Sequence, residues 1–150
     1  MALSRTSPSV GPQSPDVTGF YDKPTGSIQY LVSDPQTRKA AIIDAVMGFD
    51  PASAATDSSG VEHILRYAET ERLEIEWILD THHHADHLMA SHWLKQRLGK
   101  PNAVGAKVKE IAALWRGSGL FSEETDSLVV SGCSACFVSV SLLGTRTSIT

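Results

Sequence analysis

The 150-residue sequence lacks the features that define several classes of protein. Its two cysteines are too few for a disulfide scaffold, so we expect a reducing compartment. Its net charge of −4 argues against a general nucleic-acid-binding protein, because such proteins usually carry an excess of basic residues. No apolar run approaches the roughly 20 residues that span a bilayer, which argues against a membrane partner. With 41% hydrophobic and 20% charged residues, the composition is that of a globular domain.

The first residues differ in composition from the rest. Residues 1–16 are rich in serine and proline, and we predict that they form a disordered leader. We expect a cytoplasmic protein. Mitochondrial targeting is the alternative, because presequences are also rich in serine and poor in acidic residues, although Arg5 is the only arginine here.

The next segment predicts an antiparallel hairpin. Residues 27–32 alternate and contain β-branched and aromatic side chains, which is typical of a half-buried strand. Residues 33–36 carry a turn signal, and residues 39–44 form a second, more apolar run. The two predicted strands and their short link indicate a hairpin.

Helical and extended patterns alternate after this hairpin. The pattern predicts, in order, a loop over 50–60, a helix over 61–73, a strand over 75–80, a helix over 86–98, a short strand or link over 102–106 and a helix over 108–115. This mixture predicts an α/β fold in which helices cover a sheet, with residues 17–116 as its folded part. Residues 117–150 show no clear period and are interpreted as an atypical tail.

A cluster of histidines follows the predicted strand over 75–80. Four of the six histidines lie between residues 82 and 87, and none follows His92. On an extended segment, His82 and His84 project to the same side, so both imidazoles can reach one cation. Asp86 and His87 follow where the chain turns into the next predicted helix. Imidazole and carboxylate together suit zinc, iron or manganese.

The roles of the residues in and around this cluster differ, and two of them, Asp86 and Asp44, have an alternative role. Asp86 is a candidate ligand, and the alternative is that it only caps the next helix. Asp80 and Thr81 are expected to orient the imidazole N–H groups of the ligands. Asp44, at the end of a predicted strand, could act in the same way or be an ordinary turn residue. His83 points away from its neighbours and is interpreted as a spacer.

The pattern His82-x-His84-x-Asp86-His87, between a strand and a helix, resembles the metal signature of the metallo-β-lactamase superfamily. The resemblance covers residues 17–116 and implies an αββα sandwich with metal ions at one edge. Residues 81–88 and 93–99 resemble the persulfide dioxygenases and the related β-lactamase hydrolase-like proteins. That branch implies a single Fe(II), held by two histidines and one aspartate, and a glutathione persulfide as substrate. His82 would be one of the iron ligands.

Glyoxalase II, a hydrolase of glutathione thioesters, is the second family that the motif resembles. It implies that His82, His84, Asp86 and His87 are all ligands of a two-metal zinc site. Asp86 is then also the candidate catalytic residue. A non-catalytic metal-binding fragment is the third alternative.

The chain departs from the superfamily pattern after residue 116. Superfamily members supply further histidine and aspartate ligands there, whereas this chain has no histidine after His92 and its last aspartate is Asp126. We therefore expect only the N-terminal half of the sandwich and an inactive chain. A homodimer is an open alternative. A thiol or persulfide such as glutathione is the expected partner.

Overall fold

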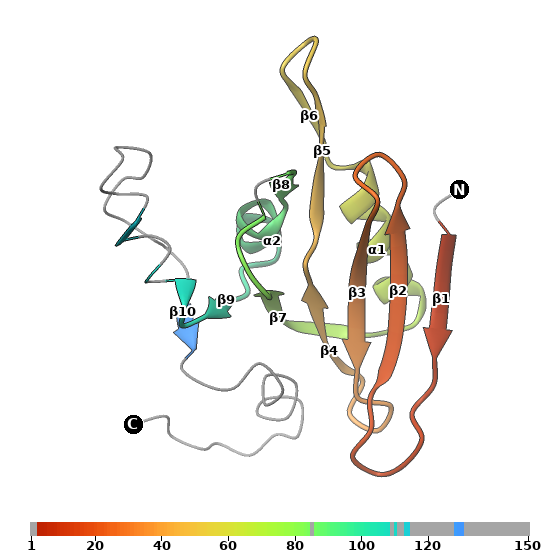
Figure 1. Ribbon diagram of the computed structural model, residues 1–150. Helices are drawn as coiled ribbons and strands as arrows, with labels where there is room; N and C mark the ends of the chain where they lie inside the picture. Colours follow the sequence, from red (N-terminus) through yellow and green to blue (C-terminus); the bar gives the residue numbers. More distant parts are fainter. Residues whose placement is uncertain (1–2, 85, 109, 111–112, 115–127, 131–150) are drawn as a thin grey trace.

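The computed structural model describes residues 3–84, 86–108, 110, 113–114 and 128–130. In chain order its elements are β1 (Leu3–Ser7), β2 (Asp16–Asp22), β3 (Ser27–Ser33), β4 (Lys39–Ile43), β5 (Val46–Asp50), β6 (Ala55–Asp57), α1 (Ser59–Thr70), β7 (Glu74–Asp80), β8 (Leu88–Met89), α2 (Ser91–Leu98), β9 (Asn102–Gly105) and β10 (Leu128–Val130). Figure 1 shows their arrangement.

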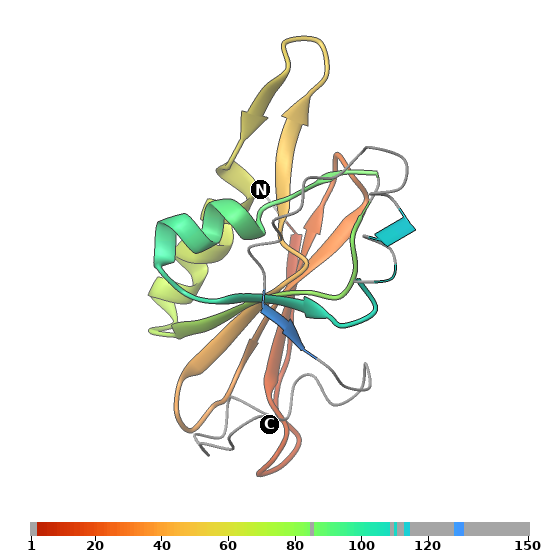
Figure 2. The ribbon, with the colours of Figure 1, turned by 90° about the vertical axis from the view of Figure 1, so that its left-hand side faces the viewer.

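The strands form one large and one small sheet. The large sheet has seven strands in the order β1-β2-β3-β4-β7-β9-β10. Strands β1 to β4 pair antiparallel, whereas β4, β7, β9 and β10 pair parallel. The small sheet has the order β6-β5-β8, and its β5–β6 hairpin projects from the body of the molecule (Figures 1 and 2). The fold is therefore α/β, as predicted.

The main core lies between the large sheet and helices α1 and α2. These helices lie on the same side of the sheet (Figure 2). On α1, Val61, Ile64 and Ala68 are spaced three and four residues apart and are buried, so they form one apolar face. Leu94 of α2 joins the same buried cluster. Gly99 ends α2 in the left-handed conformation, with φ of 65°, which glycine adopts without a steric penalty.

The opposite face of the large sheet carries a second, smaller cluster. Ala41, Leu79 and Ala103 are buried there, with Ile43 and Trp77 packed against them. Along β4 and at the end of β7 their positions alternate with those of the main core, because successive side chains of a strand point to opposite faces. Both faces of the sheet are therefore apolar near β4 and β7.

The structure confirms most of the predicted elements. The predicted strand over 27–32 is β3, the strand over 39–44 is β4, and the two pair antiparallel. The predicted helix over 61–73 is α1, and the strand over 75–80 is β7.

Other elements differ from the prediction. Leu3–Ser7 was predicted as part of a disordered leader, but it forms β1 because its backbone pairs along the edge strand β2. The predicted loop over 50–60 contains β6, which pairs with β5. The helix predicted from residue 86 begins at Ser91, because the chain first forms β8 against β5.

The structure describes only some of the residues for which the C-terminal elements were predicted. Within the predicted helix over 108–115, the described residues 108, 110, 113 and 114 are helical. The predicted atypical tail lies outside the described residues, except for β10. Among the described residues, no helix has the length and apolar character needed to cross a membrane.

Candidate metal centre

The histidine cluster lies at the carboxyl end of a parallel strand. β7 lies between β4 and β9, and residues 81–87, here called the motif loop, follow it; all but residue 85 are described. Open α/β sheets bind ligands at this end of their strands. The Asp44 N–H donates to the Leu79 carbonyl (2.9 Å), and the Ala90 N–H donates to the Ala45 carbonyl (2.8 Å). Both sides of the motif loop are thus fastened to the β4–β5 connection.

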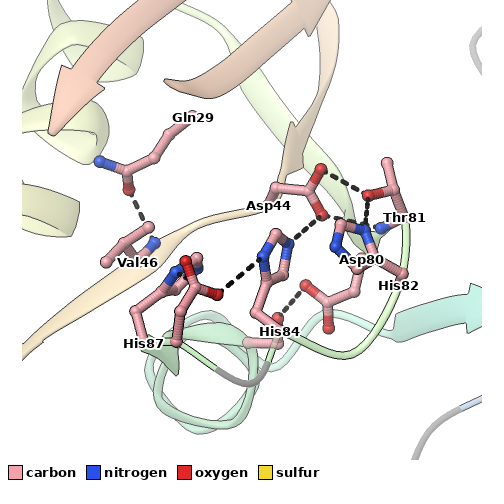
Figure 3. Close-up of polar contacts among 10 residues, drawn as sticks. Gln29, Asp44, Val46, Asp80, Thr81, His82, His84 and His87 are labelled. Carbon is pink, nitrogen blue, oxygen red and sulfur yellow. Dashed lines mark hydrogen bonds and ion pairs between the residues drawn. The ribbon is translucent and has the colours of Figure 1, made fainter. Parts of the chain in front are cut away.

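Three side chains of the motif loop bring metal-binding atoms together. One atom each from His84, Asp86 and His87 lies within 4.8 Å of the others. The Asp86 Oδ1 atom is 3.4 Å from His87 Nδ1 and 3.9 Å from His84 Nδ1. The rings of His84 and His87 lie side by side, with centroids 4.3 Å apart (Figure 3). This group therefore offers two imidazoles and one carboxylate to a single position.

The buried imidazole nitrogens of this group have no hydrogen-bond partners. The His87 side chain is 3% exposed, and neither of its ring nitrogens makes a hydrogen bond. Nε2 of His84 is also buried without one. Leaving a buried polar group unbonded costs about 1–3 kcal/mol, so proteins rarely do it without a reason. A zinc, iron or manganese ion beside Asp86 would supply a partner for one ring nitrogen of His87, and the two imidazoles and the carboxylate fit such an ion. Nε2 of His84 instead faces Asp44 Oδ1 at 3.7 Å.

The charge states suit the same role. Burial lowers the pKa of His84, because it disfavours the charged ring, and the nearby His82 and His87 lower it further. A neutral imidazole is the form that binds a metal. The pKa of Asp86 is lowered by its own backbone N–H and by the adjacent His87 and His84. At neutral pH the group therefore combines a neutral His84 with an anionic Asp86.

His82 lies beside this group but is held differently. Its ring is 3.9 Å, centroid to centroid, from the ring of His84. Its Nδ1 atom is 2.9 Å from Thr81 Oγ1. His82 does not belong to the three-residue group, and its assignment as a ligand stays a prediction.

Asp44 contacts the motif loop at two points. Its Oδ1 accepts a hydrogen bond from the Thr81 N–H (2.8 Å), and its Oδ2 accepts one from the Thr81 hydroxyl (2.8 Å). Its Oδ1 also lies 3.7 Å from His84 Nε2. Asp44 has φ of 53°, a left-handed conformation that aspartate tolerates better than most residues. The structure thus brings Asp44 and Thr81 to the predicted ligands, as an orienting role requires.

Asp80 is held from the other side of the loop. Its Oδ1 accepts a hydrogen bond from the hydroxyl of Ser91, the first residue of α2 (2.5 Å). Burial raises the pKa of Asp80 to about 6, with Asp44 adding to the rise, while Ser91 and His82 act in the opposite direction. Ser91 was not predicted from the sequence, because the apolar pattern placed the start of the helix at residue 86. A correct helix start would have put Ser91 at the first turn, next to the end of β7.

The structure settles one alternative and places the remaining histidines. Asp86 does not cap α2, because the residue at the cap position is Ala90. His83 is exposed. His92 is exposed on α2, with Nε2 2.8 Å from Gln96 Nε2. His63 packs edge-on against Phe20 in the core, 5.8 Å between ring centroids.

Comparisons with known proteins agree with this geometry. The model of a family described as "Metallo-beta-lactamase superfamily" matches residues 24–133, which extends beyond residue 116. A β-lactamase hydrolase-like protein of Xylella fastidiosa is 51% identical over 104 residues, which are 69% of this chain and 24% of that protein. A probable metallo-hydrolase of Burkholderia pseudomallei is 36% identical over 95 residues, covering 63% of this chain and 32% of that protein.

A solved structure shows the same fold. The crystal structure of the DIM-1 metallo-β-lactamase superposes with a TM-score of 0.54 at 14% identity, over 88% of this chain and 53% of that chain. The chain thus has a metallo-β-lactamase-like α/β fold and corresponds to part of such a domain, as the sequence predicted. It spans about a quarter of the length of the β-lactamase hydrolase-like relative.

Proposed function

The chain belongs to the metallo-β-lactamase superfamily, and we propose that its motif loop forms part of the metal centre of a hydrolase. One observation carries this proposal. His84, Asp86 and His87 converge, while the buried nitrogens of both imidazoles lack hydrogen-bond partners. The relatives named as hydrolase-like protein and probable metallo-hydrolase support the same class of activity.

Each residue has a defined part in this proposal. When bound, the metal ion lowers the pKa of a water molecule and polarises a substrate carbonyl. His84 and His87 would hold the ion as neutral ligands, and Asp86 would hold it as an anion. Thr81 and Asp44 would fix the orientation of the loop. Zinc is the ion expected for a hydrolase, with a thioester of glutathione as the substrate class.

A persulfide dioxygenase is the second candidate, and the contact of His82 with Thr81 favours it. His82 lies outside the three-residue group and has its own hydrogen bond to Thr81. The ring of His82 lies 3.9 Å from that of His84, centroid to centroid, so its contact with Thr81, and not its distance, distinguishes it from the group. A mononuclear iron centre would use only this first histidine of the motif. The resemblance of residues 81–88 and 93–99 to the persulfide dioxygenases supports it. Fe(II) would be the ion, and a glutathione persulfide would be the substrate class.

Metal binding tests the proposed site. We expect the full chain to bind Zn²⁺ and to lose this binding when His84, Asp86 or His87 is changed to alanine. His92→Ala is the matched control, because His92 is an exposed histidine outside the motif loop. Equal Zn²⁺ binding by His87→Ala and the unchanged chain would contradict the site.

Activity separates the two candidates. The metal-loaded chain is assayed for hydrolysis of a glutathione thioester and for O₂ consumption with glutathione persulfide. Hydrolysis that requires Asp86 supports the hydrolase. O₂ consumption that requires His82 but tolerates Asp86→Ala supports the dioxygenase and overturns the hydrolase.

A further inference from the structure

Thr81 connects the carboxylate of Asp44 with the ring of His82. The Thr81 hydroxyl donates to Asp44 Oδ2 at 2.8 Å and lies 2.9 Å from His82 Nδ1. The Thr81 N–H donates to the other carboxylate oxygen at 2.8 Å, which fixes the relative position of the two residues. Figure 3 shows this chain of three side chains.

The protons available on Asp44, Thr81 and His82 decide the direction of each hydrogen bond among them. A hydroxyl has one proton to donate, and an ionised carboxylate can only accept. The Thr81 proton is therefore committed to Asp44. The contact between Thr81 and His82 can then be a hydrogen bond only if Nδ1 of His82 carries a proton and donates it to the hydroxyl oxygen.

We infer that Thr81 is a positioning residue that fixes His82 in the tautomer with the proton on Nδ1, so that Nε2 is the nitrogen left to bind a metal ion. A metal-bound histidine commonly donates its other N–H to an oxygen, and that hydrogen bond selects the tautomer. Here the oxygen belongs to a threonine that is itself oriented by Asp44. The inference adds His82 to the proposed metal centre as a further ligand and rests on that centre for its purpose, but the tautomer itself can be measured without metal.

The same carboxylate also lies beside the second imidazole. Asp44 Oδ1 is 3.7 Å from His84 Nε2, which faces it directly and not through a hydroxyl. One aspartate therefore contacts His84 and, through Thr81, acts on His82.

Changing Asp44 to asparagine would reverse the tautomer of His82. If the amide oxygen keeps its hydrogen bond to the Thr81 N–H, the amide NH₂ group lies opposite the Thr81 hydroxyl. The hydroxyl would then accept a hydrogen bond from the amide and donate one to Nδ1 of His82, so the proton of the ring would lie on Nε2.

Nitrogen NMR of the ¹⁵N-histidine-labelled, metal-free full chain tests this inference. The spectrum is recorded well above the usual histidine pKa of about 6.5, where the rings are neutral. We expect a proton on Nδ1 of His82 in the unchanged chain and in Thr81→Ser. We expect Thr81→Val to lose this preference and Asp44→Asn to move the proton to Nε2. Thr70→Val, which removes an exposed hydroxyl bonded to the Arg66 carbonyl, should change nothing.

Zn²⁺ titration provides the second measurement. Removing a group that orients a metal ligand typically lowers affinity about 10- to 100-fold, so we expect such a loss in Thr81→Val and its recovery in Thr81→Ser. A proton on Nε2 of His82 in the unchanged chain, or a tautomer unaffected by Thr81→Val, would overturn the role of Thr81 even if Zn²⁺ binds. The expected tautomers without any Zn²⁺ binding would leave the role of Thr81 intact and refute the proposed metal centre.

Discussion

Two buried polar side chains in different regions differ in their bonding. Gln29, in strand β3 of the large sheet, is 3% exposed, and its Oε1 accepts a hydrogen bond from the Val46 N–H at 2.8 Å. The His87 side chain, in the motif loop, is also 3% exposed, yet neither ring nitrogen has a hydrogen-bond partner. Figure 3 shows both residues near the start of β5.

This difference separates the scaffold from the site. In the scaffold, meaning β2, β3, β4, β7 and the two helices, buried polar groups such as that of Gln29 stabilise the fold. In the motif loop, buried polar atoms cost stability until a ligand binds them. Functional sites are where a protein tolerates such a cost. The following changes test the comparison, from the largest expected effect on stability to the smallest.

The largest effect is expected in the apolar core of the scaffold. Ile64 of α1 is fully buried, so Ile64→Ala should leave a cavity and lower the free energy of unfolding by about 2–5 kcal/mol. Urea unfolding followed by circular dichroism measures this change. Arg66→Ala, on the exposed side of the same helix, should cost no more than about 0.5 kcal/mol. A similar loss in both variants would show that α1 is not anchored through Ile64.

A smaller loss is expected at the buried amide of the scaffold. In Gln29→Leu the new side chain has a volume similar to that of glutamine, but the buried Val46 N–H loses its acceptor. The expected loss in the free energy of unfolding is about 1–3 kcal/mol. The same urea titration measures it. An unchanged midpoint would mean that this hydrogen bond does not stabilise the start of β5.

A still smaller effect is expected at the turn between β3 and β4. The Gln36 N–H and the Thr37 hydroxyl bond to Asp34 and lower its pKa. A lowered pKa in the folded state contributes stability above the usual aspartate pKa, and that stability is lost as pH falls through the lowered value. Asp34→Ala should therefore cost less than about 1 kcal/mol at neutral pH, since Asp34 is only partly buried and solvent screens its charge.

The pH dependence of that difference is the measurement. Thermal unfolding of Asp34→Ala and of the unchanged chain should converge as the pH falls below the usual aspartate range. Gln36→Ala, which keeps the carboxylate and its partners, serves as the control. A difference that stays constant down to acid pH would assign the effect to the backbone of the turn.

The smallest effect on the metal-free fold is expected in the motif loop. His87→Leu replaces an imidazole whose ring nitrogens make no hydrogen bond with an apolar side chain, and it loses only the contact of Nδ1 with the exposed Asp86 carboxylate at 3.4 Å. The free energy of unfolding should therefore stay the same or rise by up to about 1 kcal/mol. Urea unfolding in the presence of a chelator measures it. Gln29→Leu is thus expected to lower the free energy of unfolding and His87→Leu is not, and this contrast is the difference between the two regions. A loss of more than about 1 kcal/mol in His87→Leu would place His87 in the scaffold.

The sequence predicted those elements that bury a periodic apolar face. β3, β4, α1 and β7 show alternation or helical spacing, because one side of each packs against the core. β1 is exposed along its whole length, so it has no such pattern and forms only through backbone pairing with β2. The start of α2 was missed for a related reason, since the pairing of β8 with β5 cannot be seen from local sequence.

The candidate site was predictable in composition but not in geometry. Spacing brought His82, His84, Asp86 and His87 together as candidates, and the structure groups His84, Asp86 and His87. The spacing could not show that Thr81 contacts both His82 and Asp44, because Asp44 is 37 residues away from Thr81 in sequence. Contacts of this length are set by the pairing of β4 with β7.

The shift in unfolding midpoint caused by Zn²⁺ tests the central claim most directly. A ligand that binds only the folded chain stabilises it by about 2.7 kcal/mol at 100 times its dissociation constant. We predict such a rise for the unchanged chain and for His92→Ala, and none for the triple change of His84, Asp86 and His87 to alanine. An equal rise in the triple variant would show that Zn²⁺ binds elsewhere and would contradict the assignment of the motif loop as a metal centre.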